Sequence, residues 1–187
     1  MINKYNDRPF HVVMFVSRNK DNKSVIGFKE RTRAFLTQKL PEELEKDFEA
    51  FCGQGLPHEF NRIYISVNSR KHEVVRRSLQ HYLIDHPETN LANIESLIAS
   101  LSMKKGTALT KKFLFDYDGD NNSFKYFLED VKAIFGDENL ISFNKTPNGY
   151  AVVTDRGFDT RELLAKWCEV ELKRDGMLFV DGWNTDY

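Results

Sequence analysis

The chain has 187 residues, a formal net charge of −1 and 41% hydrophobic residues, values that fit a globular protein and exclude a globally basic nucleic-acid binder. No apolar run is long enough to span a membrane and the N-terminal residues lack a signal-peptide core, so a cytoplasmic location is expected. Cys52 and Cys168 lie far apart in the sequence and are expected to be reduced thiols rather than zinc ligands.

The N-terminal part of the chain predicts both strands and helices. Short apolar runs predict the strands, and apolar spacing or helix-forming composition predicts the helices. The predicted strands cover 10–17 and 62–68, and the predicted helices cover 28–40, 41 to about 53–55, 71–85 and 90–102. Residues 104–110 show no periodicity and read as a linker. We therefore expect an N-terminal αβ elaboration over residues 1–110.

From residue 111 onward the pattern predicts the element order β-α-β-β-α-β. This order is that of a split βαβ, or ferredoxin-like, unit, as in RRM-like folds. A Pro-Asn-Gly sequence predicts the hairpin turn between the two central strands. The predicted strands are 112–117, 140–144, 150–154 and 177–180. The first predicted helix carries apolar residues from 124 to 135, and the second is capped by Asp159 or Thr160 and carries apolar residues from 163 to 172. We therefore expect an α+β protein in which a ferredoxin-like unit over 111–187 packs with the N-terminal elaboration in one compact domain.

Three acids lie at and just after the end of the first strand of this unit, in the sequence Asp116-Tyr117-Asp118-Gly119-Asp120. Asp116 and Asp118 are two residues apart, so their side chains share one face of the strand. Carboxylates held this close repel each other unless a divalent cation or a shared proton takes up the charge. Asp120 is expected to be a turn residue. The alternative is a solvated turn with no bound ion.

The expected strand order places further side chains near these acids. Right-handed crossovers put the third strand of the unit between the first and second, and the fourth on the other side of the first. Asp175, before the predicted last strand, is then a candidate third acid beside Asp118, with a plain turn residue as an equal alternative. The residues expected around the acids are Lys145, Thr146, Asn148, Tyr150, Ala151 and Asp175, while Arg156 and Asp181 are expected at the opposite end.

Paired acids in this position are what a palm-type nucleotidyl transferase needs. There, divalent ions bridge the acids to a triphosphate and stabilise the attacking and leaving oxygens. We therefore expect Mg²⁺ or Mn²⁺ at Asp116 and Asp118. Lys145 would contact phosphate, with Thr146, Asn148 and Tyr150 around the nucleotide, although ordinary turn chemistry also explains the turn residues. Arg70 is a candidate phosphate contact from the other sheet.

Three short motifs stand at 66–70 (SVNSR), 115–118 (FDYD) and 146–151 (TPNGYA). Together they resemble the archaeo-eukaryotic primase (primase-polymerase) superfamily, especially its phage-type members. The resemblance implies an αβ unit packed on an RRM-like catalytic unit, metal-dependent nucleotidyl transfer, and nucleotides, single-stranded nucleic acid and replication proteins as partners. The family's second motif ends in a nucleotide-contacting histidine where this chain has Ala151, and its third acid matches Asp175 and Asp181 imperfectly. A catalytically degenerate, binding-only relative is therefore the other form of this hypothesis.

Two other classes of protein share parts of the same sequence. Residues 149–153 (GYAVV) resemble an RNA-recognition motif in which aromatic side chains stack on bases. Exposure of Phe113, Phe115 and Tyr150 on an open sheet face would support that class. Residues 116–119 (DYDG) resemble the start of haloacid-dehalogenase phosphatases, with a nucleophilic and an acidic carboxylate. That fold requires a parallel sheet, which the predicted hairpin opposes.

Overall fold

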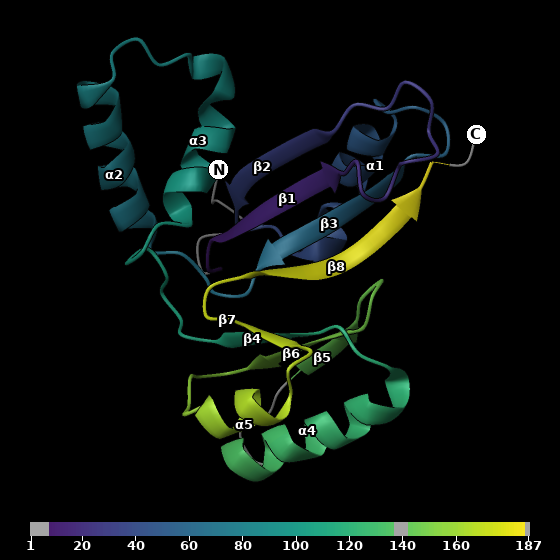
Figure 1. Cartoon of the computed structure of the whole chain (residues 1–187). Coiled ribbons are helices and arrows are strands. Elements are labelled where there is room, and N and C mark those ends of the chain that lie inside the picture. Colours follow the sequence, from purple (N-terminus) through teal and green to yellow (C-terminus); the bar gives the residue numbers. More distant parts are fainter. Residues whose placement is uncertain (1–7, 137–141, 186–187) are drawn as a thin grey trace.

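The computed structural model describes residues 8–136 and 142–185. Within these residues, two four-stranded sheets face each other, and helices lie on their outer sides (Figure 1). All the strand pairs described are antiparallel. The predicted α+β class is confirmed.

The first sheet has the strand order β2-β1-β3-β8. Successive side chains along each strand point to opposite faces of the sheet. On the outer face, Phe15 and Ile63 are buried against Phe48 of the helix α1. On the inner face, Met14 and Tyr64 turn toward the second sheet. The bounds are β1 (His11–Ser17), β2 (Arg31–Thr37), α1 (Glu45–Cys52), β3 (Phe60–Ser66) and β8 (Met177–Asn184).

The second sheet has the strand order β5-β6-β4-β7, so the predicted position of the third strand between the first and second is confirmed. Phe115 and Tyr117 are fully buried on the face covered by two helices, where they pack with Phe127. The bounds are β4 (Phe113–Tyr117), α4 (Asn121–Phe135), β5 (Ser142–Lys145), β6 (Tyr150–Thr154), α5 (Arg161–Lys166) and β7 (Val170–Lys173). Residues 140 and 141, the predicted start of the second strand, lie outside the described residues.

Two further helices, α2 (His72–Asp85) and α3 (Ile94–Ser102), form a hairpin at the side of the first sheet (Figure 1). Both were predicted from apolar spacing and are confirmed. The α3 helix packs against β2. No helix in the described ranges is long and apolar enough to cross a membrane.

The helix predicted over 28–40 is wrong, because its central residues form the strand β2. This segment contains good helix formers, which suggested a helix. It pairs instead along the whole length of β1, from His11 opposite Thr37 to Ser17 opposite Arg31. Tertiary pairing therefore overrides a weak local preference.

The end of the chain also differs from the prediction. The helix α5 ends at Lys166, and residues 170–173, predicted as helix, are the fourth strand of the second sheet. Leu163, Trp167 and Leu172 were all predicted to lie in one helix, but Leu172 fills the core from a strand. The predicted last strand, 177–180, lies in β8 and pairs with β3 of the first sheet. The chain therefore crosses from one sheet to the other between β7 and β8.

Candidate functional site

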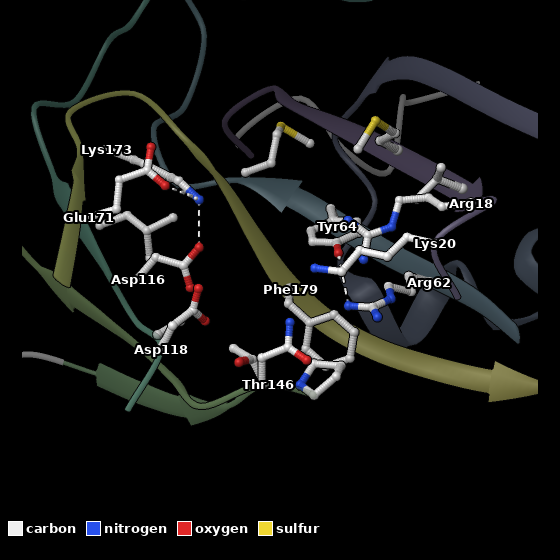
Figure 2. Close-up of a pocket in the computed structure, with 17 residues that line it drawn as sticks. Arg18, Lys20, Arg62, Tyr64, Asp116, Asp118, Thr146, Glu171, Lys173 and Phe179 are labelled. Carbon is white, nitrogen blue, oxygen red and sulfur yellow. Dashed lines mark hydrogen bonds and ion pairs between the residues drawn. The ribbon is translucent and has the colours of Figure 1, made fainter. Parts of the chain in front are cut away.

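A cleft of about 420 Å³ opens between the facing surfaces of the two sheets (Figure 2). This volume lies in the range of pockets that hold small ligands and cofactors. Beside the cleft the sheets are joined by an apolar cluster of Val67, Leu114, Ala151 and Val153, with Leu178 packed against it. The cleft therefore belongs to both halves of the chain.

One side of the cleft carries three carboxylates, Asp116, Asp118 and Glu171, which we call the acidic wall. Asp116 lies opposite Glu171 of β7 and opposite Ala151 of β6 in the strand register. The neighbouring aromatic residues of β4 point the other way, into the helix-covered core. Figure 2 shows the side chains of Asp116 and Asp118 turned toward each other. The predicted sharing of one face by these two acids is confirmed.

Lys173 of β7 neutralises part of this wall. Its Nζ lies 2.5 Å from Oδ2 of Asp116 and 3.2 Å from Oε2 of Glu171. Burial acts to lower the pKa of Lys173, but the hydrogen bonds and charges of these two carboxylates outweigh it and raise the pKa above the usual lysine value. The ammonium is therefore charged and occupies the space between the two acids.

The opposite side of the cleft carries Arg18, Lys20 and Arg62, which we call the basic wall (Figure 2). Lys20 lies in the loop between β1 and β2, and Arg62 lies on β3. Tyr64 and Phe179 stand beside these cations, and their rings meet edge to face at 5.7 Å. An anion in the cleft would meet positive charge on this side and an apolar surface next to it.

Asp21 holds the basic wall in place. Its carboxylate accepts from Nε of Arg18 at 3.0 Å and from Nη2 of Arg62 at 2.5 Å. Burial acts to raise the pKa of Asp21, but the hydrogen bonds from both arginines outweigh it and hold the pKa below the usual range. The Asn22 side chain anchors the same loop to the backbone of Phe60, at 2.6 and 3.0 Å. The two arginines of the basic wall are thus fixed before any ligand arrives.

Arg62 retains an unused donor. Its side chain is only 7% exposed, and within the described residues its Nε has no hydrogen-bond partner. A buried donor without a partner is costly, and a ligand oxygen is one way to satisfy it. Nε of Arg31 and Nε of Arg70 are in the same state but do not line the cleft, so it is the position of Arg62 in the cleft lining that links it to an anionic ligand.

The hairpin turn between β5 and β6 forms the rim of the cleft beside the acids. Thr146, Pro147 and Asn148 line the cleft, so the predicted position of Thr146 and Asn148 near the acids is confirmed. A Cβ added to Gly149 would lie 1.9 Å from the carbonyl oxygen of Tyr117, so only glycine permits this approach. The turn therefore lies directly against the end of β4.

Two predicted substrate contacts lie outside the cleft. The Tyr150 ring stacks on Phe124 at 3.8 Å, and its hydroxyl donates to Asn121 at 3.1 Å, so it belongs to the helix-covered face. Lys145 is exposed on the edge strand β5. Among the described residues, it is not one of those that line the cleft. The period of two along a strand explains why Ala151, but not Tyr150, faces Asp116.

The expectation that Asp175 lies beside Asp118 is wrong. In the register, Leu114 lies opposite Lys173, so Asp175 is at the start of β4 while Asp118 follows its end. The Asp175 carboxylate accepts two bonds of 2.8 Å from Arg70, whose side chain is fully buried. Arg70 is thus also withdrawn from the cleft. The pair fixes the crossover between the sheets.

Asp120 acts as the expected turn residue. Its carboxylate caps α4 by accepting from the backbone N–H groups of Asn122 and Ser123. Hydrogen bonds from the Ser123 side chain and backbone, followed by the Asn122 backbone, lower its pKa. Asp120 therefore serves the helix and is not part of the acidic wall.

Sequence reasoning missed the roles of Glu171, Lys173 and the three cations of the basic wall. The sequence Val170-Glu171-Leu172-Lys173 alternates apolar and charged residues, which is the period of a strand with one wet face. Reading that period would have placed Glu171 beside Asp116. The basic wall had no comparable signal, because its residues come from separate segments.

The structure also bears on the two other classes of protein. Phe115 is fully buried, and Phe113 and Tyr150 pack against the same helix-covered core, so these rings are not available to stack on bases. The antiparallel pairing of the described strands differs from the parallel sheet of a haloacid-dehalogenase fold. The structure therefore supports neither the RNA-recognition class nor the haloacid-dehalogenase phosphatase class.

No family model matches the chain, and neither a curated protein nor a solved structure is significantly similar to it. Within the described residues, no three acid, histidine or cysteine side chains converge as a ready metal site. The donor chemistry of the acidic wall nevertheless suits Mg²⁺ or Mn²⁺, which prefer carboxylate oxygens. A cation, the Lys173 ammonium, already lies between two of these carboxylates.

Proposed function

We propose that the protein binds a divalent metal ion together with a nucleoside triphosphate in the cleft, as a primase-polymerase-like protein. One observation carries this proposal: a single cleft presents carboxylates on one wall and arginine and lysine side chains on the other. A metal–triphosphate complex has the matching distribution of charge, with a cation at one end and phosphate oxygens around it. Neither an uncharged ligand nor a simple cation would use both walls.

The fold of the second sheet supports this proposal. Its first strand, β4, lies between the third and fourth strands of the β-α-β-β-α-β order, and both helices cover one face. We propose that residues 113–173 form a ferredoxin-like, RRM-like unit of the palm type. In such a unit, the face opposite the helices is free to carry a site, and here it carries Asp116.

Asp116 and Asp118 would hold the metal ion, and Glu171 is the third carboxylate within reach of the same wall. When bound, Mg²⁺ or Mn²⁺ would neutralise phosphate charge and stabilise the attacking and leaving oxygens of a phosphoryl displacement. Asp116 and Asp118 fix the position of the reacting end because β4 is paired on both sides. Asp175 has no part in this site, because Arg70 binds it elsewhere.

The basic wall would bind the phosphates. Arg62 offers its guanidinium, and Arg18 and Lys20 add charge from the loop between β1 and β2. Arginine suits phosphate oxygens because its planar guanidinium donates several hydrogen bonds at fixed angles. Tyr64 and Phe179 provide an apolar surface for the sugar or base. Single-stranded nucleic acid and replication proteins remain the partners that the family resemblance implies.

Ala151 bears on whether transfer follows binding. It lines the cleft opposite Asp116, where the resemblance implies a nucleotide-contacting histidine. A methyl group makes no hydrogen bond to phosphate, so one contact for orienting the nucleotide is missing. Binding is thus the part of the function that this chain supports best, and nucleotidyl transfer is the activity to be assayed.

The test is nucleotide binding by calorimetry in the presence of Mn²⁺. We expect the parent protein to bind a nucleoside triphosphate, and the double variant Asp116→Asn/Asp118→Asn to lose binding. Asp155→Asn is the matched control, because Asp155 is an exposed acid after β6, at the other end of the same sheet. No binding by the parent protein would sink the proposal. A primer-synthesis assay on the same samples would then separate a transferase from a binding-only relative.

A further inference from the structure

Lys173 lies where a metal ion at the acidic wall would have to lie. Asp116 and Glu171 face each other across neighbouring strands, and the Lys173 ammonium bridges them at 2.5 and 3.2 Å. A carboxylate oxygen that accepts from an ammonium at this distance cannot also ligate a cation from the same side. Metal and Lys173 therefore compete for Asp116.

The ion pair between Lys173 and Asp116 differs from the ion pair between Arg70 and Asp175 at the crossover between the sheets. Arg70 is fully buried and binds Asp175 through two parallel bonds, so that pair is a permanent part of the fold. Lys173 is one-third exposed and is a single point charge on a flexible stem. Partly exposed lysine pairs add little stability, and their ammonium can turn to water at small cost.

We propose that Lys173 is an internal counterion that occupies the acidic wall until a divalent ion displaces it, so that it sets the metal affinity of the site. The inference rests on the metal–nucleotide site proposed above. The ammonium binds both Asp116 and Glu171, so its departure frees both carboxylates for a metal ion. A divalent ion, with twice the charge, is attracted more strongly than the ammonium by the same carboxylates.

The same exchange couples the metal to the anionic ligand. Lys173 lines the cleft, so an ammonium that leaves Asp116 for the water of the cleft adds to the positive charge near the phosphates. Bound phosphates would then strengthen metal binding in two ways: they ligate the metal directly, and they attract the released Lys173 ammonium away from Asp116. Mn²⁺ alone is therefore expected to bind more weakly than Mn²⁺ with a nucleotide.

The experiment is a Mn²⁺ titration, by calorimetry, of the full chain and of Lys173→Met, which keeps the apolar stem and removes the charge. We expect Mn²⁺ to bind about tenfold more tightly to Lys173→Met, the change that corresponds to about 1.4 kcal/mol. Lys173→Arg retains the charge and should show no such gain. Lys166→Met is the matched control, because Lys166 forms a similar pair with Asp130 on the helix side of the sheet.

The outcomes separate this inference from the proposed function. If the parent binds Mn²⁺ and Lys173→Met binds it no more tightly, the counterion role is overturned and the metal site stands. If Lys166→Met gains as much as Lys173→Met, the gain is a general effect of charge and the role is again overturned. If neither the parent nor Lys173→Met binds Mn²⁺, the metal site itself fails. If the double variant Lys173→Met/Asp118→Asn binds Mn²⁺ no more tightly than the parent, the Mn²⁺ ion bound by Lys173→Met lies at the acidic wall.

Discussion

The two walls of the cleft have opposite charges, yet each contains one residue of the other sign. Asp21 bridges Arg18 and Arg62 in the basic wall, and Lys173 bridges Asp116 and Glu171 in the acidic wall. The surroundings of the two bridges differ. In the Asp21 bridge, Asp21 and Arg62 are 10% and 7% exposed, although Arg18 is 33% exposed. In the Lys173 bridge, Lys173, Asp116 and Glu171 are 33%, 29% and 71% exposed, so none of the three is closed to water.

This difference decides what each bridge does. Where water is excluded, separating the charges leaves one of them buried and unpaired, so the Asp21 bridge is part of the folded structure. Where water reaches the pair, either partner can be solvated alone, and the Lys173 bridge can open. The basic wall is therefore preorganised for an anion, and the acidic wall is held neutral until a cation arrives.

The largest expected effect comes from removing Arg62. Arg62→Met leaves Asp21 with one partner in a nearly closed site, so we expect a loss of about 3 kcal/mol in the free energy of unfolding, measured by urea denaturation. Nucleotide binding should fall as well. Arg33→Met is the matched control, because Arg33 pairs with Glu95 at the surface. Equal losses in both variants would show that the basic wall is no more fixed than a surface pair.

A second change deforms the acidic side and leaves the basic wall intact. In Gly149→Ala, the new Cβ meets the Tyr117 carbonyl oxygen, so the hairpin turn must move away from the end of β4. We expect a loss of roughly 1–3 kcal/mol, as for overpacking, together with weaker metal binding. Gly53→Ala is the control, since Gly53 is exposed with a φ of −63°. A parent-like melting temperature in Gly149→Ala would mean that the turn does not touch β4.

The Asp21 bridge also predicts a dependence of stability on pH. Because the pKa of Asp21 is lowered on folding, its stabilisation is complete above the unfolded value of about 3.9 and is lost as the pH falls through the lower folded value. The stability difference between the parent and Asp21→Asn should therefore narrow below about pH 4. Urea unfolding at a series of pH values measures this difference. A constant gap across the series would contradict the lowered pKa.

The smallest effect is expected at Lys173. Lys173→Met should change the free energy of unfolding by less than about 1 kcal/mol, because its ion pair is partly exposed. Urea denaturation beside the Arg62→Met samples gives the direct comparison between the two bridges. A loss as large as that of Arg62→Met would show that the acidic wall is also permanently closed.

The sequence was most informative where local patterns are strong. The short apolar run of β4, the helical spacing of Phe124, Phe127 and Val131, and the Asn-Gly turn predicted their elements, and the right-handed crossover rule then gave the central strand order. They also placed Asp116, Asp118 and the hairpin turn together. These features depend on neighbours within one strand, one helix or one turn, which a sequence displays directly.

The prediction failed where local preference and tertiary pairing disagree. Residues 31–37 and 170–173 have helix-compatible composition or spacing, but each completes the edge of a sheet. Because the second segment was assigned to a helix, Glu171 and Lys173 were missed and Asp175 was placed at the wrong end of β4. One misassigned strand thus changed three candidate roles.

The sequence by itself determined the α+β class, the acid pair on one face of a strand, and the turn beside it, because each follows from the period of a strand or the chemistry of a turn. Only the tertiary structure decided that β8 returns to the first sheet, that the two sheets enclose a cleft, and that Arg62 faces Asp116 across it. The physical reason is that these opposite charges come from distant segments and are brought together only when the two sheets pack. A local sequence pattern cannot predict that packing.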